Sequence, residues 1–442
     1  MSLRDFLQQL DDQKKLLHVT ESISKKYEIA GVLKKLEPRP VLFENVRESK
    51  FQVVGNLFCG KGPFAEYFGL RPDDIIATLA QAIDRHHPPS RFGIDPQRNA
   101  VAPCQEVVNF HPDLGELPIL FHCEGDGGNY ISSGVFLARH PAYGQNADFH
   151  RAMQFSKTKM AIRVVKNRHF DTFLQDQKTL DVAVCVGLSP NILVAAATSV
   201  ALGMDELEIA NALETFSVVP AKTVDILVPA DSEFVLEGTV YYDQRHSEGP
   251  FVDLTETQDI VRNEPVFVVN AITHRNDAIW HALLPGALEH KLLMGMPREP
   301  TIFQSVNRVV KCLDVCVNPG GCSWLHAIIQ IDKVAEDDGE KAVRAAFAGH
   351  RSCKHVFVVD KDIDIYNPLE VEWAMATRFQ GDEDLVMLAR SPGSSLDPSS
   401  EPDTHNTCRV GFDLTRPLEA KGKQFGKTLF PQVDLRKWGI EE

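Results

Sequence analysis

The middle of the chain constrains the fold most strongly. From about residue 103 to residue 280, runs of β-branched and aromatic residues dominate, and a polar, proline-bearing stretch precedes them. They predict a helical insertion over 191–214 and strands over 149–155, 160–165, 179–186, 221–229 and 266–273. Strands in this number favour a barrel-like sheet. We therefore predict a split β-barrel with inserted helices within residues 101–300.

The two flanks follow other patterns. Residues 1–100 combine apolar residues at helical spacing with a pair of short strands: helices over 3–17 and 27–36, strands over 41–46 and 51–55. Residues 301–415 alternate strand, helix, strand and helix: 326–333, 338–348, 355–360 and 368–377. The predicted class is α/β (α+β), with an N-terminal α/β segment, the central barrel and a C-terminal α/β domain. A loop is expected over 391–407, and an irregular tail over 416–442 is free to pack on a neighbouring subunit.

The charge balance limits the possible partners. The chain has 46 lysines and arginines against 61 acidic residues, a formal net charge of −15. General binding to nucleic acid or to an anionic membrane requires a basic surface, so the sequence argues against both. The longest apolar stretches, such as 192–197, fall far short of the roughly 20 residues that span a bilayer. Because no secretory-signal pattern follows Met1, we expect a cytoplasmic protein.

Two motif classes find no support. The nine cysteines are scattered, as expected for reduced thiols, and four residues invite a zinc interpretation: Cys312, Cys316, Cys322 and His326. Residues 310–316 read as a strand, however, in which positions i and i+4 lie about 13 Å apart. The glycine-rich segment 124–129 lacks the G-x-G-x-x-G order of a dinucleotide-binding loop. We therefore disfavour both zinc and conventional NAD chemistry.

Arg151 is the first unusual residue. By strand alternation it shares a face with Phe149, Met153 and Phe155. An unpaired charge on an apolar face is costly, so Arg151 needs either a carboxylate in a structural ion pair or an anionic ligand.

Glu248 and Asp253 are its candidate partners. Gly249 and Pro250 interrupt the strand between them, which lets both carboxylates point into one pocket. Two close carboxylates titrate apart, so one stays ionised and the other can act as an acid. A turn with two solvated acids is the simpler interpretation of this segment alone.

Asn146, His169 and Glu206 form a second candidate group. Asn146 begins the Arg151 strand, His169 is expected to end the next strand, and Glu206 opens a helix on its core-facing side. An amide oxygen, an imidazole and a carboxylate suit Mn²⁺ or Mg²⁺ better than zinc. Spacing alone does not bring the three together, and the helix dipole also explains a glutamate at this position.

Taken together, these segments resemble the UbiD family of prenylated-flavin-dependent decarboxylases. The most specific matches are the Asn-x₄-Arg spacing from Asn146 to Arg151 and the Glu-Gly-Pro-Phe-x-Asp block from Glu248 to Asp253. The matches follow the family's order over nearly the whole chain: 146–151, 161–163, 168–169, 203–206, 235–238, 248–253 and 393–398.

The resemblance implies a flavin-binding barrel, a C-terminal oligomerisation domain and a set of site residues. Asn146, His169 and Glu206 would hold a divalent metal, usually Mn²⁺, against the phosphate of prenylated FMN, with K⁺ nearby on main-chain oxygens. Glu248, Arg151 and Asp253 would form the family's Glu-Arg-Glu/Asp triad. Besides Arg151 and His169, the residues expected to contact the cofactor are Phe149, His150, Arg163 and Arg168.

The implied reaction is a reversible, non-oxidative decarboxylation. Loss of CO₂ leaves a carbanion, and the prenylated flavin is the covalent electron sink that no side chain supplies. Arg151 would orient the substrate carboxylate, and Asp253 would protonate the carbon after CO₂ leaves. A flavin prenyltransferase would supply the cofactor, and the protein would be a homo-oligomer, either a dimer or a hexamer.

His290 and Arg298 are the candidate substrate-binding residues. They could reach a second carboxylate or a ring hydroxyl, and similar placement occurs in family members that act on furan-dicarboxylate. Basic residues favoured by a helix dipole explain them equally well. We predict an aromatic or heteroaromatic acid, with conversion of furan-2,5-dicarboxylate to 2-furoate as the sharpest candidate. The alternatives are a hydroxybenzoate, pyrrole or acrylic acid decarboxylase, a non-catalytic carboxylase subunit, and a flavin-free Mn²⁺ hydrolase.

Overall fold

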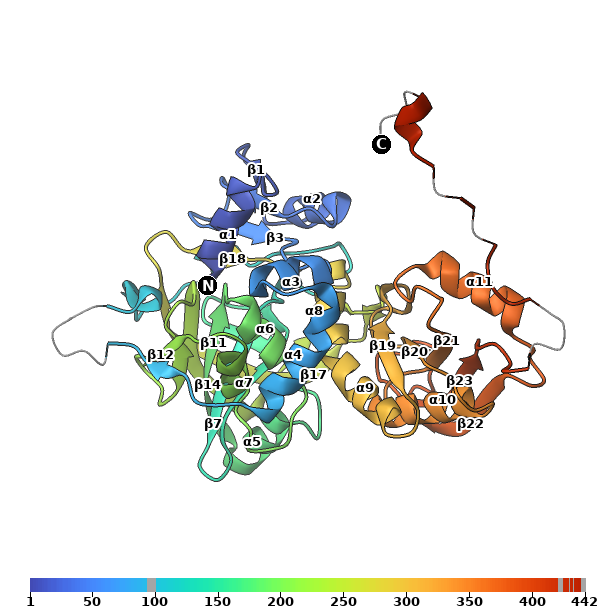
Figure 1. Ribbon diagram of the computed structural model, residues 1–442. Helices are drawn as coiled ribbons and strands as arrows, with labels where there is room; N and C mark the ends of the chain where they lie inside the picture. The colour runs from blue at the N-terminus through green and yellow to red at the C-terminus, as the bar shows by residue number, and fades with distance from the viewer. Residues whose placement is uncertain (94–100, 420–423, 429, 432, 439–442) are drawn as a thin grey trace.

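The computed structural model describes residues 1–93, 101–419, 424–428, 430–431 and 433–438. A small N-terminal layer lies above the central sheet, and a C-terminal α/β unit lies beside both (Figure 1). The mixed α/β class predicted from the sequence is confirmed. Among the described residues, no helix is long and apolar enough to cross a membrane. Short 3₁₀ helices occur at Pro72–Asp74, Pro103–Gln105, Leu114–Glu116, Met296–Arg298, Pro319–Gly321 and Leu435–Trp438.

The N-terminal layer contains four helices and a small sheet. Its helices are α1 (Leu3–Asp12), α2 (Glu28–Leu36), α3 (Lys61–Phe68) and α4 (Ile75–Asp84). The sheet runs β1 (Leu17–Val19), β2 (Val41–Phe43), β3 (Gln52–Gly55) and β18 (Ile279–His281). A capping box of Ser2 and Asp5 starts α1. Because β18 comes from the end of the central segment, the layer is joined to the barrel through its sheet.

The central sheet has nine strands and forms a half-barrel. Its order is β6-β9-β10-β17-β14-β11-β7-β8, with β5 paired to β17. All neighbours within it are antiparallel. The strands are β5 (Val107–Asn109), β6 (Asn129–Ile131), β7 (Val135–His140), β8 (Gly144–Phe149), β9 (Ala152–Gln154), β10 (Lys159–Ile162), β11 (Thr179–Val186), β14 (Phe234–Glu248) and β17 (Arg262–His274).

The single strand predicted over 149–155 is wrong in one informative respect. The chain leaves β8 after Phe149 and starts β9 at Ala152, so His150 and Arg151 lie between two strands. β8 pairs with β7 at one end of the sheet, whereas β9 pairs with β6 and β10 at the other end. At His150 and Arg151 the chain therefore crosses from one end of the half-barrel to the other. The hairpin from β9 to β10 is confirmed.

Three other predictions in this segment need correction. The insertion over 191–214 is two helices, α6 (Pro190–Ala196) and α7 (Glu206–Leu213), separated by a loop in which Gly203 has a φ of +94°. His169 opens α5 (His169–Gln177) instead of ending a strand. Of the strand predicted over 221–229, only the end forms β13. Strand β13 belongs with β4 and β12 to a small sheet, and β15 and β16 form a separate hairpin. The bounds of these strands are β4 (Ser90–Arg91), β12 (Ser217–Pro220), β13 (Leu227–Pro229), β15 (Phe251–Val252) and β16 (Gln258–Asp259).

The C-terminal unit confirms the predicted alternation of strands and helices. The linking helices α8 (Leu288–Gly295) and α9 (Glu299–Asn307) lead into a five-stranded sheet of order β19-β20-β21-β23-β22. Strands β20, β21 and β23 are parallel to one another, as crossover helices require. The remaining bounds are β19 (Cys312–Val317), β20 (His326–Ile331), β21 (His355–Asp360), β22 (Leu385–Pro392), β23 (Asn406–Asp413), α10 (Asp338–Gly349) and α11 (Pro368–Arg378). The loop predicted over 391–407 is shorter, because its ends belong to β22 and β23.

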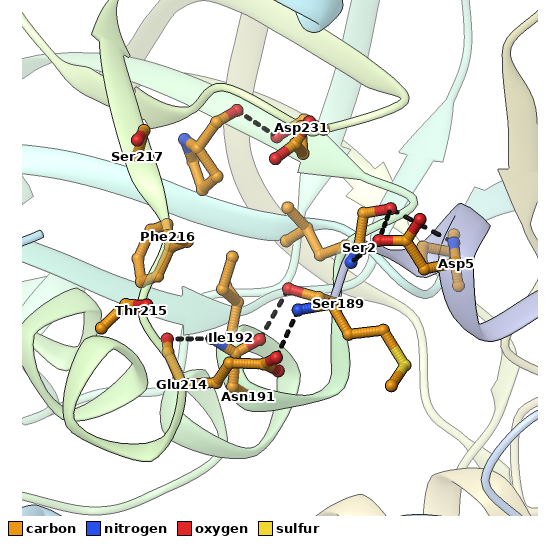
Figure 2. Close-up of a pocket in the computed structure, with 15 residues that line it drawn as sticks. Ser2, Asp5, Ser189, Asn191, Ile192, Glu214, Thr215, Phe216, Ser217 and Asp231 are labelled. Atoms are coloured by element: carbon orange, nitrogen blue, oxygen red, sulfur yellow. Dashed lines mark hydrogen bonds and ion pairs between the residues drawn. The ribbon is translucent and has the colours of Figure 1, made fainter. Parts of the chain in front are cut away.

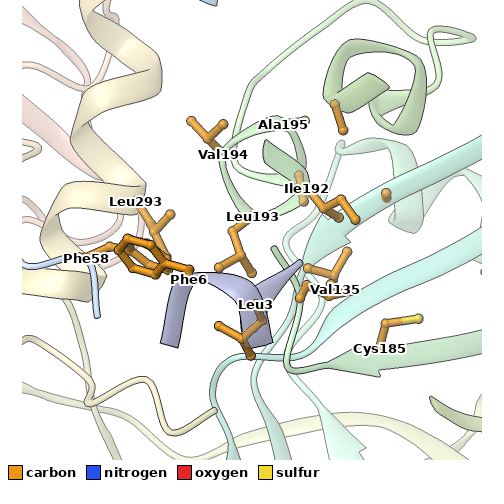
Figure 3. Close-up of a cluster of buried hydrophobic side chains, with 14 of the residues drawn as sticks. Leu3, Phe6, Phe58, Val135, Cys185, Ile192, Leu193, Val194, Ala195 and Leu293 are labelled. Carbon is orange, nitrogen blue, oxygen red and sulfur yellow. The ribbon is translucent and has the colours of Figure 1, made fainter. Parts of the chain in front are cut away.

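Two hydrophobic clusters join the N-terminal layer to the barrel. One of them includes Leu33 of α2 and Phe136 of β7, and the other lies under α1. Side chains of α1, α6 and α8 pack against the sheet there (Figure 3), and the labelled members include Leu3, Phe6, Phe58, Val135, Cys185, Ile192, Leu193 and Leu293. The C-terminal sheet buries two further clusters, one of which also includes Ile76 of α4. The linking helices thus connect two units with largely different cores.

Candidate active site

Arg151 is the centre of a buried charge network. It lies where the chain crosses from β8 to β9, over residues 149–152, and we call this region the seam of the half-barrel. Arg151 Nε and Nη2 donate to the two carboxylate oxygens of Glu248 at 2.9 and 3.0 Å, and Nη1 donates to Asp253 Oδ2 at 2.9 Å. The side chain of Glu248 is fully buried, whereas that of Asp253 is 20% exposed. The structure therefore brings the predicted arginine and both predicted carboxylates together, and the interpretation of two solvated acids is wrong.

The local sequence explains how the two acids reach Arg151. Glu248 is the last residue of β14, and Gly249, at a φ of +101°, turns the chain into the hairpin that carries Asp253. The glycine-rich segment packs directly beneath this turn: Gly127 N donates to Pro250 O at 2.7 Å. A Cβ on Gly127 would lie 2.2 Å from Gly249 O. The glycines of this segment thus allow its backbone to pack closely against the turn at Gly249.

The sequence prediction missed Asp259, a further carboxylate on Arg151. Asp259 Oδ2 accepts from Arg151 Nη2 at 2.8 Å and also contacts Arg262. The signal was the hairpin itself, because pairing of Phe251 with Asp259 places the acid next to the turn. Burial alone would lower the pKa of Arg151, but the hydrogen bonds and charges of its carboxylates, Glu248 first, raise it. Arg151 is therefore firmly cationic.

Asn146, His169 and Glu206 also converge, from three different elements. His169 Nδ1 lies 3.0 Å from Asn146 Oδ1 and 3.9 Å from Glu206 Oε1. Glu206 is buried at the start of α7, and its Oε2 accepts from Ala147 N at 2.8 Å. Among the described residues no group of three His, Cys, Asp or Glu side chains gathers as a metal site, and this trio relies on an amide as its third member.

The chemistry of this trio fits a divalent cation. Burial raises the pKa of Glu206 well above its usual range, so a nearby positive ion would favour the carboxylate form. Burial also lowers the pKa of His169, which favours the neutral imidazole that binds metals. The buried Asn146 Nδ2 has no hydrogen-bond partner among the described residues. One carboxylate, one imidazole and one amide are a donor set that Mn²⁺ accepts.

The remaining predicted cofactor residues surround the same seam. His150 is buried, with Nδ1 3.0 Å from Arg163 O, and Phe149 ends β8. Arg163 is already paired, because its Nη1 donates to Glu264 Oε1 at 2.9 Å. Arg168 is exposed and immediately precedes α5. Of these four residues, the structure leaves only Arg168 as a cation without a carboxylate within 4.0 Å in the described parts of the chain.

His290 lies in the first turn of α8, and Arg298 ends the short 3₁₀ helix Met296–Arg298 that follows α8. His290 is close enough to the triad for the charges of Asp253 and Arg151 to act on it, although burial dominates and lowers its pKa. Arg298 Nη2 donates to Ala197 O at 3.1 Å, and its guanidinium lies over the Trp324 ring at 5.3 Å. Burial, aided by the charge of Arg168, lowers the pKa of Arg298 to about 10. His290 Nδ1 accepts from Gly286 N at 3.0 Å, and a Cβ on Gly286 would lie 3.0 Å from Asp253 O, so His290 lies next to the segment that carries Asp253.

A separate cavity of about 360 Å³ does not belong to this site. It opens between the start of α1 and the segment around Glu214 (Figure 2). Glu214 and Asp231 line it, together with Ser2, Ser189 and Asn191. None of the predicted site residues lines this cavity.

Comparison with known proteins gives the family. Models of the N-terminal, Rift-related and C-terminal domains of 3-octaprenyl-4-hydroxybenzoate carboxy-lyase, which define UbiD proteins, match residues 7–83, 96–288 and 291–414. Anhydromevalonate phosphate decarboxylase of Methanothermobacter thermautotrophicus is 39% identical over 430 residues, which cover 95% of this chain and 98% of that protein. The chain belongs to the UbiD family.

Solved structures of UbiD-class enzymes agree with this assignment. HmfF from Pelotomaculum thermopropionicum, in complex with FMN, matches with a TM-score of 0.94 at 33% identity, covering 99% of this chain and 100% of that chain. An evolved dimeric form of HmfF, in complex with prenylated FMN, matches with a TM-score of 0.90 at 32% identity and 99% coverage of both chains. The family resemblance inferred from the sequence is confirmed, and this UbiD protein is an enzyme of the carboxy-lyase class.

Proposed function

We propose that this enzyme is a prenylated-FMN-dependent decarboxylase acting on a small unsaturated acid that carries a second anionic group. The observation that supports this most directly is the buried network of Arg151 with Glu248 and Asp253. An arginine held between two carboxylates can bind the carboxylate of a substrate. One of its acidic partners can then supply a proton at the same place. Two similar UbiD-class structures hold FMN or prenylated FMN, which supports the flavin.

Each residue of the network has a proposed role. Arg151 binds and orients the carboxylate that leaves, and Glu248 fixes the guanidinium through two hydrogen bonds. Asp253 protonates the carbon after CO₂ departs, because it is the more exposed of the two acids and can exchange its proton with solvent. The bound flavin supplies the electron sink for the carbanion, which no side chain here can provide.

The cofactor phosphate has a proposed site at the other end of the seam. Asn146, His169 and Glu206 would hold Mn²⁺, which would neutralise the phosphate charge. K⁺ would bind main-chain oxygens nearby. Arg168, next in sequence to His169, adds a positive charge at the same end.

The substrate proposal depends on Arg298. It is a partly buried cation whose Nε is enclosed without a hydrogen-bond partner in the described structure. A second anionic group on the substrate would provide that partner. The relative that is 39% identical is named for a phosphate-bearing substrate, which makes a phosphate the first candidate. The placement of His290 and Arg298 supports furan-2,5-dicarboxylate as the second candidate, with a carboxylate in the same position.

Co-expression with a flavin prenyltransferase tests the function. The purified protein should absorb visible light through a bound flavin and should release CO₂ from anhydromevalonate phosphate or, failing that, from furan-2,5-dicarboxylate. A panel with a hydroxybenzoate, pyrrole-2-carboxylate and cinnamate covers the other acids. A flavin-loaded protein that releases CO₂ from none of them would favour a non-catalytic subunit. Metal-dependent hydrolysis without flavin absorbance would favour the hydrolase.

We further propose a cytoplasmic homo-oligomer, a dimer or a hexamer. The described part of the tail runs away from the C-terminal unit (Figure 1) and exposes large apolar side chains, including Phe430 and Trp438. Apolar residues on an extended segment gain stability by packing on a second copy. Light scattering coupled to size-exclusion chromatography would give the mass, and deletion of residues 424–442 should lower it.

A further inference from the structure

Arg151 is bound by more carboxylates than its charge balances. Glu248, Asp253 and Asp259 all accept hydrogen bonds from it within 3.0 Å. Within the described parts of the chain, Arg262 is the one other arginine or lysine that pairs with an acid of this network, since it also contacts Asp259. Two guanidinium groups therefore face three carboxylates, and a substrate carboxylate would be a fourth.

The hydrogen-bond geometry identifies where the substrate must enter. Glu248 occupies the Nε–Nη2 edge of the Arg151 guanidinium. A carboxylate that binds with two parallel hydrogen bonds needs the remaining edge, formed by Nη1 and Nη2. Asp253 already accepts from Nη1, and Asp259 accepts from the second hydrogen of Nη2. Among the described residues, four of the five guanidinium hydrogens have an acceptor, and one hydrogen on Nη1 has none.

Glu248 and Asp253 are poorly placed to leave the Arg151 guanidinium. Glu248 is fully buried, and it also accepts from the Tyr130 hydroxyl at 3.1 Å. Asp253 Oδ1 and Asp259 Oδ1 each accept from the following amide, at 2.6 and 2.9 Å, so this contact does not distinguish the two aspartates. Asp253 must stay, because in the proposed function it lies beside the reacting carbon.

Asp259 can leave without becoming unpaired. The oxygen that contacts Arg151 also contacts Arg262, so a small rotation exchanges one guanidinium for the other. The hairpin that carries Asp259 is held by two residue pairs, and the next residues, Ile260 and Val261, are 67% and 52% exposed. Short pairing and exposure are features of segments that move at low cost.

We propose that Asp259 occupies the position of the substrate carboxylate in the empty site and transfers to Arg262 when the substrate binds. The role rests on the proposed function, in which Arg151 binds that carboxylate. Asp259 is then a positioning residue, because it keeps Arg151 oriented and its charge compensated between turnovers. The affinity for the substrate then depends on how much more strongly its carboxylate binds the Nη1–Nη2 edge of Arg151 than Asp259 does.

Two single variants should shift carboxylate binding in opposite directions. Asp259→Asn removes the competing charge and should tighten binding of 2-furoate or benzoate to the flavin-loaded enzyme about tenfold, the size of one charge-assisted hydrogen bond. Arg262→Gln removes the alternative partner, holds Asp259 on Arg151 and should weaken binding several-fold. In the double variant residue 259 carries no charge that could be held on Arg151, so the loss of Arg262 should not matter and the affinity should match that of Asp259→Asn.

Calorimetric titration with either acid gives the affinities, and steady-state assays should show KM moving with them while kcat changes less. If both single variants weaken binding, Asp259 supports the hairpin only, and the proposal is overturned. Unchanged affinities would overturn it as well. Opposite shifts in an enzyme that decarboxylates nothing would support the exchange and reject the proposed function, so the two failures are distinguishable.

Discussion

Arg151 and Arg298 are both enclosed by the protein, and their surroundings are opposite. Arg151 has three carboxylates within hydrogen-bonding distance, whereas Arg298 has none within 4.0 Å among the described residues and bonds only a backbone carbonyl. The pKa of Arg151 is raised by its acidic partners, and the pKa of Arg298 is lowered by burial to about 10. One cation is compensated by the chain, and the other is not.

This difference separates two uses of a buried charge. A compensated arginine binds a new anion only by exchange, so it can orient a substrate without holding it tightly. An uncompensated arginine lowers stability until an anion arrives, so it gains the full benefit of that anion. We therefore expect Arg151 to govern turnover and Arg298 to govern selection among acids.

The largest effect should come from removing the compensated arginine. Arg151→Ala leaves the buried Glu248 without its cation, which should lower the free energy of unfolding by about 3–5 kcal/mol and abolish CO₂ release. Urea denaturation measures the first effect. The matched control is Arg139→Ala, since Arg139 forms an exposed pair with Asp225 at 2.7 Å and should cost about 0–1 kcal/mol. Equal stability of the two variants would show that the network is not held by Arg151.

The next effect concerns the cofactor end of the seam. Glu206→Ala should strip metal and flavin together, because it removes the carboxylate of the proposed metal site. Elemental analysis and the visible spectrum measure both. Glu208→Ala is the control: it lies on the same helix and pairs with His86 at 2.7 Å. A metal-free Glu206→Ala protein with full flavin occupancy would contradict the site. Flavin loss in Arg298→Ala would instead assign Arg298 to the cofactor phosphate and weaken the comparison.

Asp253→Asn tests the acid on the compensated arginine. It should keep the flavin spectrum and lower kcat by about 10² to 10⁴, the usual contribution of a positioned acid. Asp181→Asn serves as the control, because Asp181 is exposed on β11 and bonds only Thr239. Near-normal turnover of Asp253→Asn would move the proton donor to Glu248.

The smallest expected effect is on kcat/KM, and it should differ between acids with and without a second anionic group. Arg298→Ala should lower kcat/KM for a phosphate-bearing acid or a dicarboxylate by about 10- to 150-fold, equivalent to one charge-assisted hydrogen bond, while a small monoacid is nearly unaffected. The exposed Arg308 provides the control variant Arg308→Ala. An equal loss for both kinds of acid would make Arg298 structural and remove the main support for a second anionic group.

Periodicity predicted those parts of the fold whose sequence is locally consistent. Strand β11 and helix α10 begin where the pattern places them, because apolar alternation and helix-start signals agree there. The break between β8 and β9 was not predictable in this way. Residues 149–155 alternate like one strand. The strand is interrupted where Arg151 contacts carboxylates of the distant segment 248–259, and no local pattern shows that contact.

The candidate site shows the same limit. Arg151 was identifiable as a charge in need of a partner, and Glu248 and Asp253 as its partners, because each breaks a local pattern. Asp259 breaks none: it is an ordinary acid in a polar turn until pairing with Phe251 brings it to the guanidinium. The position of His169 at the start of a helix was likewise a matter of tertiary structure, since its sequence neighbours fit a strand end as well.

The crossing of the chain between β8 and β9 limits the distance between Asn146 and Arg151. Asn146, at the proposed metal end, and Arg151, at the proposed substrate end, have four residues between them, so their Cα atoms lie at most about 17 Å apart. Insertion or deletion of one residue here would change that span and turn every following side chain to the other face. In the proposed function, the Asn-x₄-Arg spacing would therefore set the length of cofactor that fits between the two ends. Redesign for a shorter or longer cofactor would have to alter the backbone and not merely its side chains.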